Sequence, residues 1–374
     1  MAKLSFSARA HTTATPIRPE RETASEGVPV PSRRTRAWLA IAAAVLSGMH
    51  ALTFVLADSR GRDFDQTWYA VHALFRGRNP YLEIGPGLAF NWGEHFYYPL
   101  TAAVAISPLA WLPHLVATPV FAALSAAAFV WASTRTSLAP AVVITSASAA
   151  MASETVQWSP LLAAAYGIPW LGVILSAKPT IGLAIFAARP SRMAVLGSLV
   201  LVAIALLFLP TWPLDWIHAV RNTSVLKSGG TTYAPPIRTI GGAFALVAIL
   251  RWRRPEARLL LALACVPQTP LLYETVPLFL VPATILEGGV LWLGSWLAAL
   301  TIYVAAPSDF GSTRFPVSAN AIGVFLYLPC AVMILRRPNR GNIPQRLERW
   351  LSGVRLPRGI VGESDTPRHG NGLR

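Results

Sequence analysis

Long apolar stretches recur along the whole of this 374-residue chain, and they constrain its fold more than any other feature. Hydrophobic residues make up 53% of the sequence and charged residues only 13%. A soluble domain carries about 25% charged residues, so this chain has too little polar surface to cover a water-soluble body. We therefore expect an all-α protein whose main part is a polytopic bundle of transmembrane helices.

The first apolar stretch, 37–57, has the length of the roughly 20 residues that cross the hydrocarbon core of a bilayer. A cleavable signal has a shorter apolar core nearer the start of the chain, so we predict a retained helix. The later stretches raise the expected total to about ten spans, although prolines interrupt several of them. The stretch 98–113 could also stay within the outer leaflet instead of crossing the membrane. These later stretches are 98–113, 115–133, 138–152, 158–177, 193–210, 237–250, 259–273, 276–288, 289–306 and 317–335.

Charge and composition divide the chain into three parts. We predict a disordered basic cytoplasmic arm over 1–36, a membrane domain over 37–336 and a basic cytoplasmic tail over 337–374. Cytoplasmic loops are enriched in Lys and Arg, which places the first polar loop, 58–97, outside. Topology thus accounts for the net charge of +15, and we expect no nucleic-acid partner. The abundance of Arg, Ala and Pro is typical of a GC-rich bacterial genome and indicates the inner membrane of a bacterium.

The first outer loop contains an amphipathic segment that begins at Asp63. At 100° per residue, its apolar and polar side chains fall on opposite faces of a helix, and Gly77 and Asn79-Pro80 are typical of a helix end. We predict a helix that lies flat on the bilayer, with its polar stripe facing an aqueous cavity. The apolar face consists of Phe64, Trp68, Val71, Leu74 and Phe75, and the polar stripe of Asp65, Tyr69, His72 and Arg76.

Asp63 has two compatible interpretations. With Gln66 three residues later, it can be the N-cap of this helix in a capping box. It can also be a general base at the rim of a membrane cavity. Asp65 is a second candidate for the base, or a solvated side chain, and His72 and Arg76 are either solvated or in contact with a lipid phosphate.

Several short motifs follow one another in an order that supports the second interpretation. They are Asp63-Phe64, Trp68, Ala70, Gly77, Pro80-Tyr81, Tyr97-Tyr98-Pro99, Pro108-Leu109-Ala110, Leu112-Pro113, Gln157 and Lys178-Pro179. In this order they resemble glycosyltransferase family 87, the polyprenol-phosphate-mannose-dependent mannosyltransferases of the GT-C architecture. The resemblance covers 37–210 well and 211–335 loosely. Leu100 departs from it where a second proline is common, and Thr275 where a late histidine would fall. If that histidine binds the donor phosphate in the family, this chain binds it differently or not at all.

The resemblance implies an inverting glycosyltransferase that needs no cofactor. Its donor would be a sugar, mannose or another hexose or pentose, on a polyprenyl phosphate. Its acceptor would be a hydroxyl of a glycolipid or an envelope glycan. Asp63 would take the proton of that hydroxyl, with Asp65 in reserve. The site would face the outside of the membrane, among membrane lipids.

Cationic side chains are the candidates for contact with the donor phosphate. Lys178 is the only lysine within the apolar region, and its alternative role is to snorkel to the membrane interface. Arg221, Lys227 and Arg238 flank a later outer loop and are either phosphate ligands or solvated.

Neutral side chains are the candidates for contact with the sugar. Tyr97, Tyr98 and Trp92 can stack on a sugar ring or belong to an interfacial aromatic belt. Tyr81 and Gln157 fit the family pattern, and Gln157 can alternatively cap a helix. No group of residues has the spacing of metal ligands, so we expect no tightly held metal, while a weak divalent ion at the first outer loop stays open.

Two other functions stay open. A transporter or flippase of lipid-linked sugars would favour internal repeats and charges near the midplane of paired helices. The sequence shows no repeat, and its acidic candidates lie in an outer loop. A non-catalytic membrane assembly protein would leave the helix at Asp63 with no role beyond capping.

Overall fold

The protein is mostly helical, as predicted, in the computed structural model, which describes residues 30–57, 62–222, 234–305 and 314–341. Its one small sheet within these ranges pairs two parallel strands, with Ile84 opposite Phe90. Most of the predicted arm and tail, and Lys227, lie outside the described residues.

The secondary structure alternates between α-helices and short 3-10 segments. The α-helices and strands are α1 (Arg33–Leu56), α2 (Asp63–Phe75), α3 (Pro80–Glu83), β1 (Ile84–Gly85), β2 (Phe90–Asn91), α4 (Leu100–Ile106), α5 (His114–Ser133), α6 (Ala147–Glu154), α7 (Ser159–Ala164), α8 (Pro179–Ala188), α9 (Arg192–Phe208), α10 (Trp212–Asn222), α12 (Ile240–Ala243), α13 (Pro255–Cys265), α14 (Ile285–Ala305), α15 (Arg314–Ile322) and α16 (Leu328–Leu335). The 3-10 segments are η1 (Ser107–Trp111), η2 (Ala139–Thr145), η3 (Pro169–Ala177), η4 (Pro236–Arg238), η5 (Phe244–Arg251) and η6 (Leu272–Leu280), and η7 (Gly323–Tyr327) is a π-helical turn.

The prediction of about ten membrane spans is wrong for the described residues. Four helices are long and apolar enough to cross a bilayer, namely α1, α5, α14 and the run from α15 to α16, and the count rises to five if α9 and α10 form one broken span. The other apolar stretches are divided into short pieces, often at proline, which cannot donate a backbone hydrogen bond. Pro169 and Pro179 both begin new helices. With ten residues, α8 is about 15 Å long, half of the hydrocarbon thickness.

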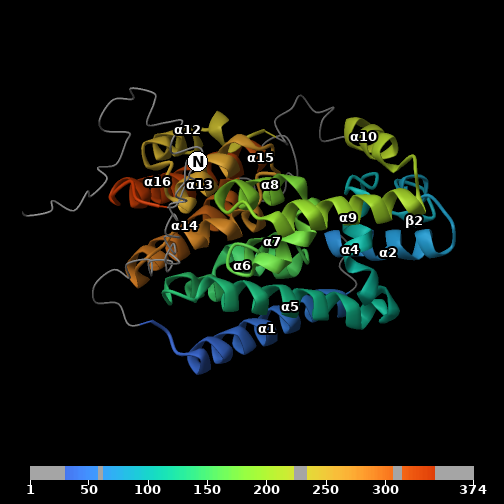
Figure 1. Ribbon diagram of the computed structural model, residues 1–374, viewed down its shortest axis with the longest axis horizontal. Helices are drawn as coiled ribbons and strands as arrows, with labels where there is room; N and C mark the ends of the chain where they lie inside the picture. Colours follow the sequence, from blue (N-terminus) through green and yellow to red (C-terminus); the bar gives the residue numbers. More distant parts are fainter. Residues whose placement is uncertain (1–29, 58–61, 223–233, 306–313, 342–374) are drawn as a thin grey trace, which may run out of the picture.

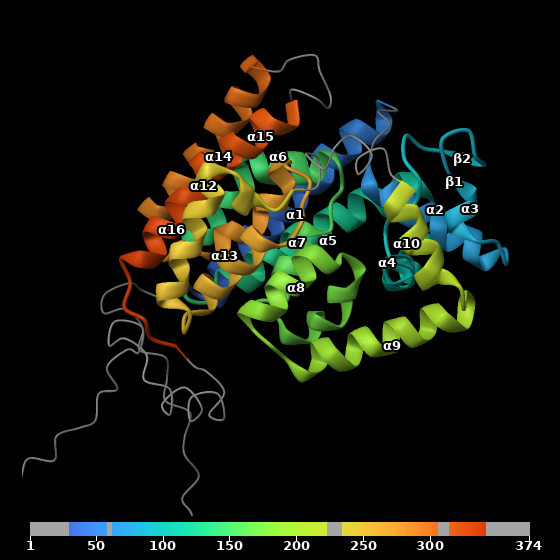
Figure 2. The same ribbon diagram turned by 90° about the horizontal axis from the view of Figure 1, so that it is seen from above.

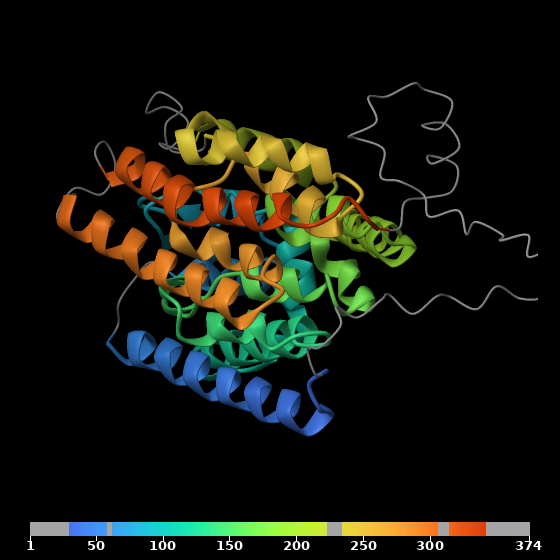
Figure 3. The same cartoon turned by 90° about the vertical axis from the view of Figure 1, so that its left-hand side faces the viewer.

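Helices α1 and α5 lie side by side and form one layer of the molecule (Figures 1 and 3). Small residues permit their close approach, because a Cβ atom added to Gly48 would lie only 3.1 Å from the Cβ of Ala123. The hydroxyl of Ser47 also donates to the carbonyl of Ala122 at 3.3 Å. Contacts between small residues are typical of helices that associate in a membrane.

A second layer is formed by α14, which packs along α15, η7 and α16 (Figure 3). Helix α6 lies between the two layers and contacts both α1 and α14, and α7 contacts α5 and α8. Broken helices are tolerated at membrane depth only where protein or a cavity covers them, and the central position of α6 meets that condition.

Helices α9 and α10 connect the bundle to the region of α2, α3 and α4 (Figure 2). The chain bends by 95° between them, and α10 returns to contact α3 and α4. This return brings α10 next to the segment before α4.

Helix α2 begins at Asp63 and ends before Gly77, as predicted, and Gly77 has the positive φ of 68° that favours glycine. Its surroundings differ from the prediction, because α4, η1 and α5 pack against it. Phe64 stacks on Phe121 of α5 with ring centroids 4.9 Å apart, and Asp65 on the predicted polar stripe is also buried. The helix is therefore packed into protein, and the start of its polar stripe is covered where an open stripe was predicted.

Candidate functional site

A cavity of about 380 Å³ lies where five segments of the chain meet. They are the start of α2, the segment before α4, the start of α8, one face of α10 and the segment that leads into η6. The polar and aromatic lining residues are Asp63, Tyr97, Tyr98, Lys178, Thr180, Trp216, Gln268, Thr269, Tyr273 and Glu274. Two carboxylates and one ammonium thus face one small space.

The carboxylate of Asp63 points into the protein and does not cap α2, so the capping-box prediction is wrong. Arg62 is the N-cap, and Asp63 is the first helical residue. Its Oδ2 accepts hydrogen bonds from the hydroxyl of Tyr98 at 2.7 Å and from Nε2 of Gln157 at 2.6 Å. Its Oδ1 receives a longer bond, 3.4 Å, from Nε2 of Gln66. Donors from distant parts of the chain occupy Oδ2, so Oδ1 is the oxygen that is more available to accept a further hydrogen bond.

A strained turn places Gln157 beside Asp63. Val156 has a φ of 47°, and it is the one non-glycine residue with positive φ among the residues that the structure describes. A β-branched residue in this region is a conformational outlier, and such strain tends to occur at functional sites. The carbonyl of Thr155 also accepts the backbone N–H of Asp63 at 3.0 Å, which fixes the turn to the start of α2.

Lys178 is held inside the cavity and does not snorkel to the surface. Its Nζ lies 2.8 Å from Oε1 of Glu274 and donates to Oε1 of Gln157 at 3.2 Å. Nζ also lies 4.8 Å from the ring centroid of Tyr273, a cation–π distance. Burial raises the pKa of Glu274, which lies outside the candidate spans, and the charge of Lys178 opposes this rise. A continuous polar chain therefore runs from Asp63 through Gln157 and Lys178 to Glu274.

The tyrosines of the predicted sugar site take different positions. Tyr97 and Tyr98 line the cavity and stack with ring centroids 5.3 Å apart. Tyr81 is buried behind them, and its hydroxyl donates to the carbonyl of Tyr98 at 3.0 Å. Trp216 of α10 completes this wall by donating from Nε1 to the carbonyl of Tyr97 at 2.8 Å. Trp92 does not line the cavity and stacks on Phe90 instead.

Asp65 lies outside this cavity, although only one residue separates it from Asp63. Its carboxylate is buried and pairs with Nε of Arg62 at 3.0 Å and with Nε2 of His114 at 2.7 Å. The sequence interpretation of Asp65 as a solvated residue is wrong, because α5 begins at His114 and covers it. Both oxygens are occupied by cationic or ring donors, which leaves Asp65 a structural role.

The remaining predicted cations do not line the cavity. Arg76, Arg221 and Arg238 are exposed. His72 is half-buried, with its ring 4.0 Å from that of Trp68. From the predicted set, the structure therefore brings Asp63, Lys178, Tyr97 and Tyr98 into the cavity wall, with Gln157 bonded between Asp63 and Lys178. The other predicted residues that the structure describes lie outside the cavity.

Glu274 is the main residue that the sequence interpretation missed. An acidic residue between two apolar stretches is costly in a membrane unless it is paired, and the isolated Lys178 in the same region is the matching signal. Thr275, where the family histidine would fall, points elsewhere: its hydroxyl bonds with that of Ser148 at 2.8 Å. Gln268 and Thr269 also line the cavity without having been predicted.

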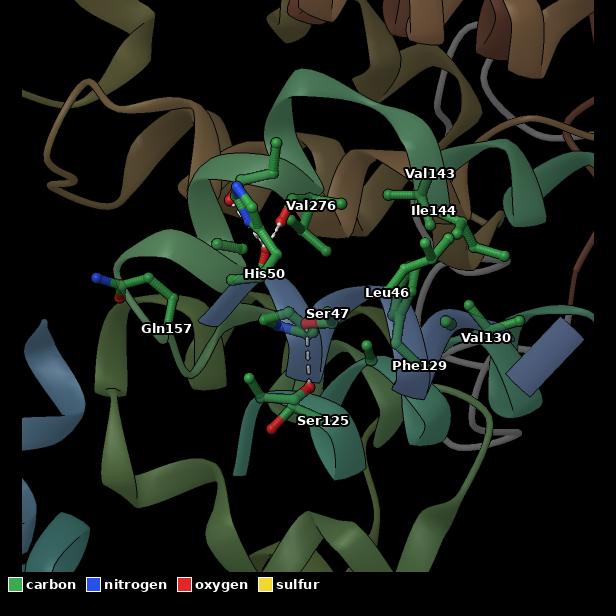
Figure 4. Close-up of a pocket in the computed structure, with 18 of the residues that line it drawn as sticks. Leu46, Ser47, His50, Ser125, Phe129, Val130, Val143, Ile144, Gln157 and Val276 are labelled. Atoms are coloured by element: carbon green, nitrogen blue, oxygen red, sulfur yellow. Dashed lines mark hydrogen bonds between the residues drawn. The ribbon is translucent and has the colours of Figure 1, made fainter. Parts of the chain in front are cut away.

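A second cavity of about 270 Å³ lies between α1, α5, α6 and η2 (Figure 4). Its wall is mostly apolar and includes Leu46 of α1, whose side chain is also exposed at the protein surface. His50 is its one ionisable lining residue and bonds through Nδ1 to the hydroxyl of Ser153 at 2.8 Å. Gln157 lies at one end of this cavity and also separates it from Asp63, which its amide contacts. The apolar and the polar cavities are therefore neighbours.

Within the described ranges, no group of three or more His, Cys, Asp or Glu side chains could hold a metal ion. No protein-family model, curated protein or solved structure matches the chain. The geometry of the two cavities is therefore the basis for a functional proposal.

Proposed function

We propose that this protein is a membrane glycosyltransferase that moves a sugar from a polyprenyl phosphate to an acceptor hydroxyl of a glycolipid or envelope glycan, outside the bacterial inner membrane. The observation that carries the proposal is the placement of Asp63 and Lys178 in the wall of one cavity, joined through Gln157. A carboxylate to take the proton and a cation for the leaving phosphate are the two charges that such a transfer requires.

The proposed reaction follows from the hydrogen bonds of Asp63. The acceptor hydroxyl binds near Oδ1, which takes its proton as the acceptor oxygen attacks the anomeric carbon. The bond between that carbon and the phosphate oxygen breaks, and the lipid phosphate leaves with the electron pair. Tyr98 and Gln157 hold Oδ2 at 2.7 and 2.6 Å, so the carboxylate keeps its orientation during the transfer. Attack from the face opposite to the leaving phosphate inverts the anomeric centre.

The second cavity supports a lipid-linked substrate. It is mostly apolar, it lies against the candidate spans α1 and α5, and it adjoins the polar cavity at Gln157. An apolar chain that lies there would bring its polar end close to Asp63.

The test is an assay of the full chain in liposomes with polyprenyl phosphates that carry mannose, glucose or arabinose and a membrane extract as acceptor. Asp63→Asn should reduce transfer by about 10²- to 10⁴-fold, because an amide cannot accept the proton. Asp215→Asn is the matched control. Asp215 of α10 bonds to Asn79 at 2.9 Å and does not line the cavity, so this variant should retain transfer.

Transfer by Asp63→Asn at the wild-type rate would refute the proposal. Movement of a lipid-linked sugar across the bilayer with no transfer by the wild-type protein would favour a transporter instead.

A further inference from the structure

The ammonium of Lys178 already has three neighbours in the cavity, one of them a carboxylate. An ammonium has three donors. Glu274 and Gln157 occupy two of them, at 2.8 and 3.2 Å, and the ring of Tyr273 lies 4.8 Å from Nζ. An anionic ligand at Lys178 would therefore compete with the carboxylate of Glu274 for the same ammonium.

The charges of the cavity oppose the simple addition of an anion. Asp63 and Glu274 carry two negative charges when ionised, against the single positive charge of Lys178. The other titratable groups around Glu274 are tyrosines, Tyr98 and Tyr273 at the cavity and Tyr327 of η7, which interacts electrostatically with Glu274. Repulsion is stronger in a low-dielectric site than in water, so a phosphate would be poorly bound while both carboxylates are ionised.

One oxygen of the buried Glu274 carboxylate is free to take up a proton. Its carboxylate is buried, with a side chain only 4% exposed. Oε1 contacts Lys178, and Oε2 has no hydrogen-bond partner among the residues that the structure describes. A proton on Oε2 would turn this unpartnered acceptor into a donor.

We propose that Glu274 is the resident counter-ion of Lys178 and that a phosphodiester headgroup replaces it, with Glu274 taking up one proton. The Lys178–Glu274 ion pair breaks, a Lys178–phosphate pair forms, and the proton comes from solvent. The ligand brings one negative charge and the proton cancels another, so the net charge of the cavity is unchanged. This inference rests on the proposed function for its choice of a phosphate lipid as the ligand.

Binding should consequently depend on pH with a defined sign. Since the bound form carries one more proton than the free form, affinity is greatest when Glu274 is protonated in the free protein. It falls as pH rises above the pKa of Glu274, by up to about tenfold per pH unit. Burial raises that pKa, which moves the fall toward neutral pH.

The experiment measures binding of farnesyl methyl phosphate, a lipid phosphodiester with a single charge, to the full chain in detergent by titration calorimetry. Repeating it in buffers of different ionisation enthalpy counts the protons, and the wild type should take up about one per ligand. Glu274→Gln should bind about tenfold more tightly near neutral pH and lose both the proton uptake and the pH dependence. Glu287→Gln is the matched control. Glu287 pairs with Arg337 and does not line the cavity, so this variant should behave as the wild type.

The double variant Lys178→Met with Glu274→Gln removes both buried charges together, which avoids leaving one unpaired. It should fold and lose binding. Weaker binding by Glu274→Gln would overturn the inference, since it would mean that the carboxylate contacts the ligand directly. No proton uptake by the wild type, or no binding by the wild type at any pH, would overturn it as well.

These outcomes are separable from those of the transfer assay. Binding without proton uptake would refute the replacement of Glu274 by phosphate at Lys178, but it would not bear on Asp63 as the proposed base. Full transfer by Asp63→Asn would refute Asp63 as the base, but it would not bear on the replacement of Glu274 by phosphate at Lys178.

Discussion

Asp63 and Asp65 stand two positions apart on one helix, both are buried, and their environments differ completely. Asp65 contacts Arg62 and His114, so its charge is compensated within the structure. Asp63 contacts the neutral donors Tyr98 and Gln157 and faces a cavity. A buried carboxylate that is fully paired cannot be removed without leaving its partner uncompensated, whereas one held by neutral groups at a cavity retains a reactive oxygen.

The largest effect expected from this contrast is on stability. Asp65→Asn leaves Arg62 buried without its counter-ion and should lower the free energy of unfolding by about 3 kcal/mol. Asp63→Asn should cost about 1 kcal/mol, because the amide can still accept from Tyr98. Thermal unfolding of the two purified variants in detergent measures the difference. An equal loss of stability in both would show that Asp63 is as structural as Asp65.

The position of α2 could be predicted from sequence, because local signals determine it. Periodicity fixes its start at Asp63, and Gly77 with positive φ fixes its end. The burial of Asp65 could not be predicted in this way, since it depends on His114 of α5, which is far away in the sequence. Helical periodicity shows which side chains share a face but not what covers that face.

The number of spans and the role of Glu274 could not be predicted from the sequence either. Hydropathy detects apolar stretches, but it does not show what packs against the short pieces that begin at Pro169 and Pro179. The pair of Lys178 and Glu274 forms only when α8 and η6 come together. The likeness to a family identified Asp63, Gln157 and Lys178 as candidates without indicating how they connect.

A smaller effect separates the two tyrosines nearest to Asp63. Tyr98→Phe removes one hydrogen bond to a charged oxygen and should lower the rate of transfer by about tenfold, with the acceptor KM nearly unchanged. Tyr81→Phe removes only the bond to the carbonyl of Tyr98 and should lower the rate by a few-fold at most. Steady-state kinetics of both variants tests this. A larger loss in Tyr81→Phe would mean that the backbone at Tyr98, and not its hydroxyl, positions the carboxylate.

The smallest effect is expected at the exposed cations. Arg76 and Arg221 lie outside the cavity and are exposed, so their charges are screened by water and salt. Arg76→Ala and Arg221→Ala should each change transfer by less than about twofold, and Lys178→Met should abolish it under the same conditions. A loss of tenfold or more in Arg221→Ala, with thermal unfolding unchanged, would mean that the donor phosphate is bound at the end of α10. In that case Lys178 would serve mainly to neutralise Glu274, and its replacement by Met would act through the unpaired carboxylate.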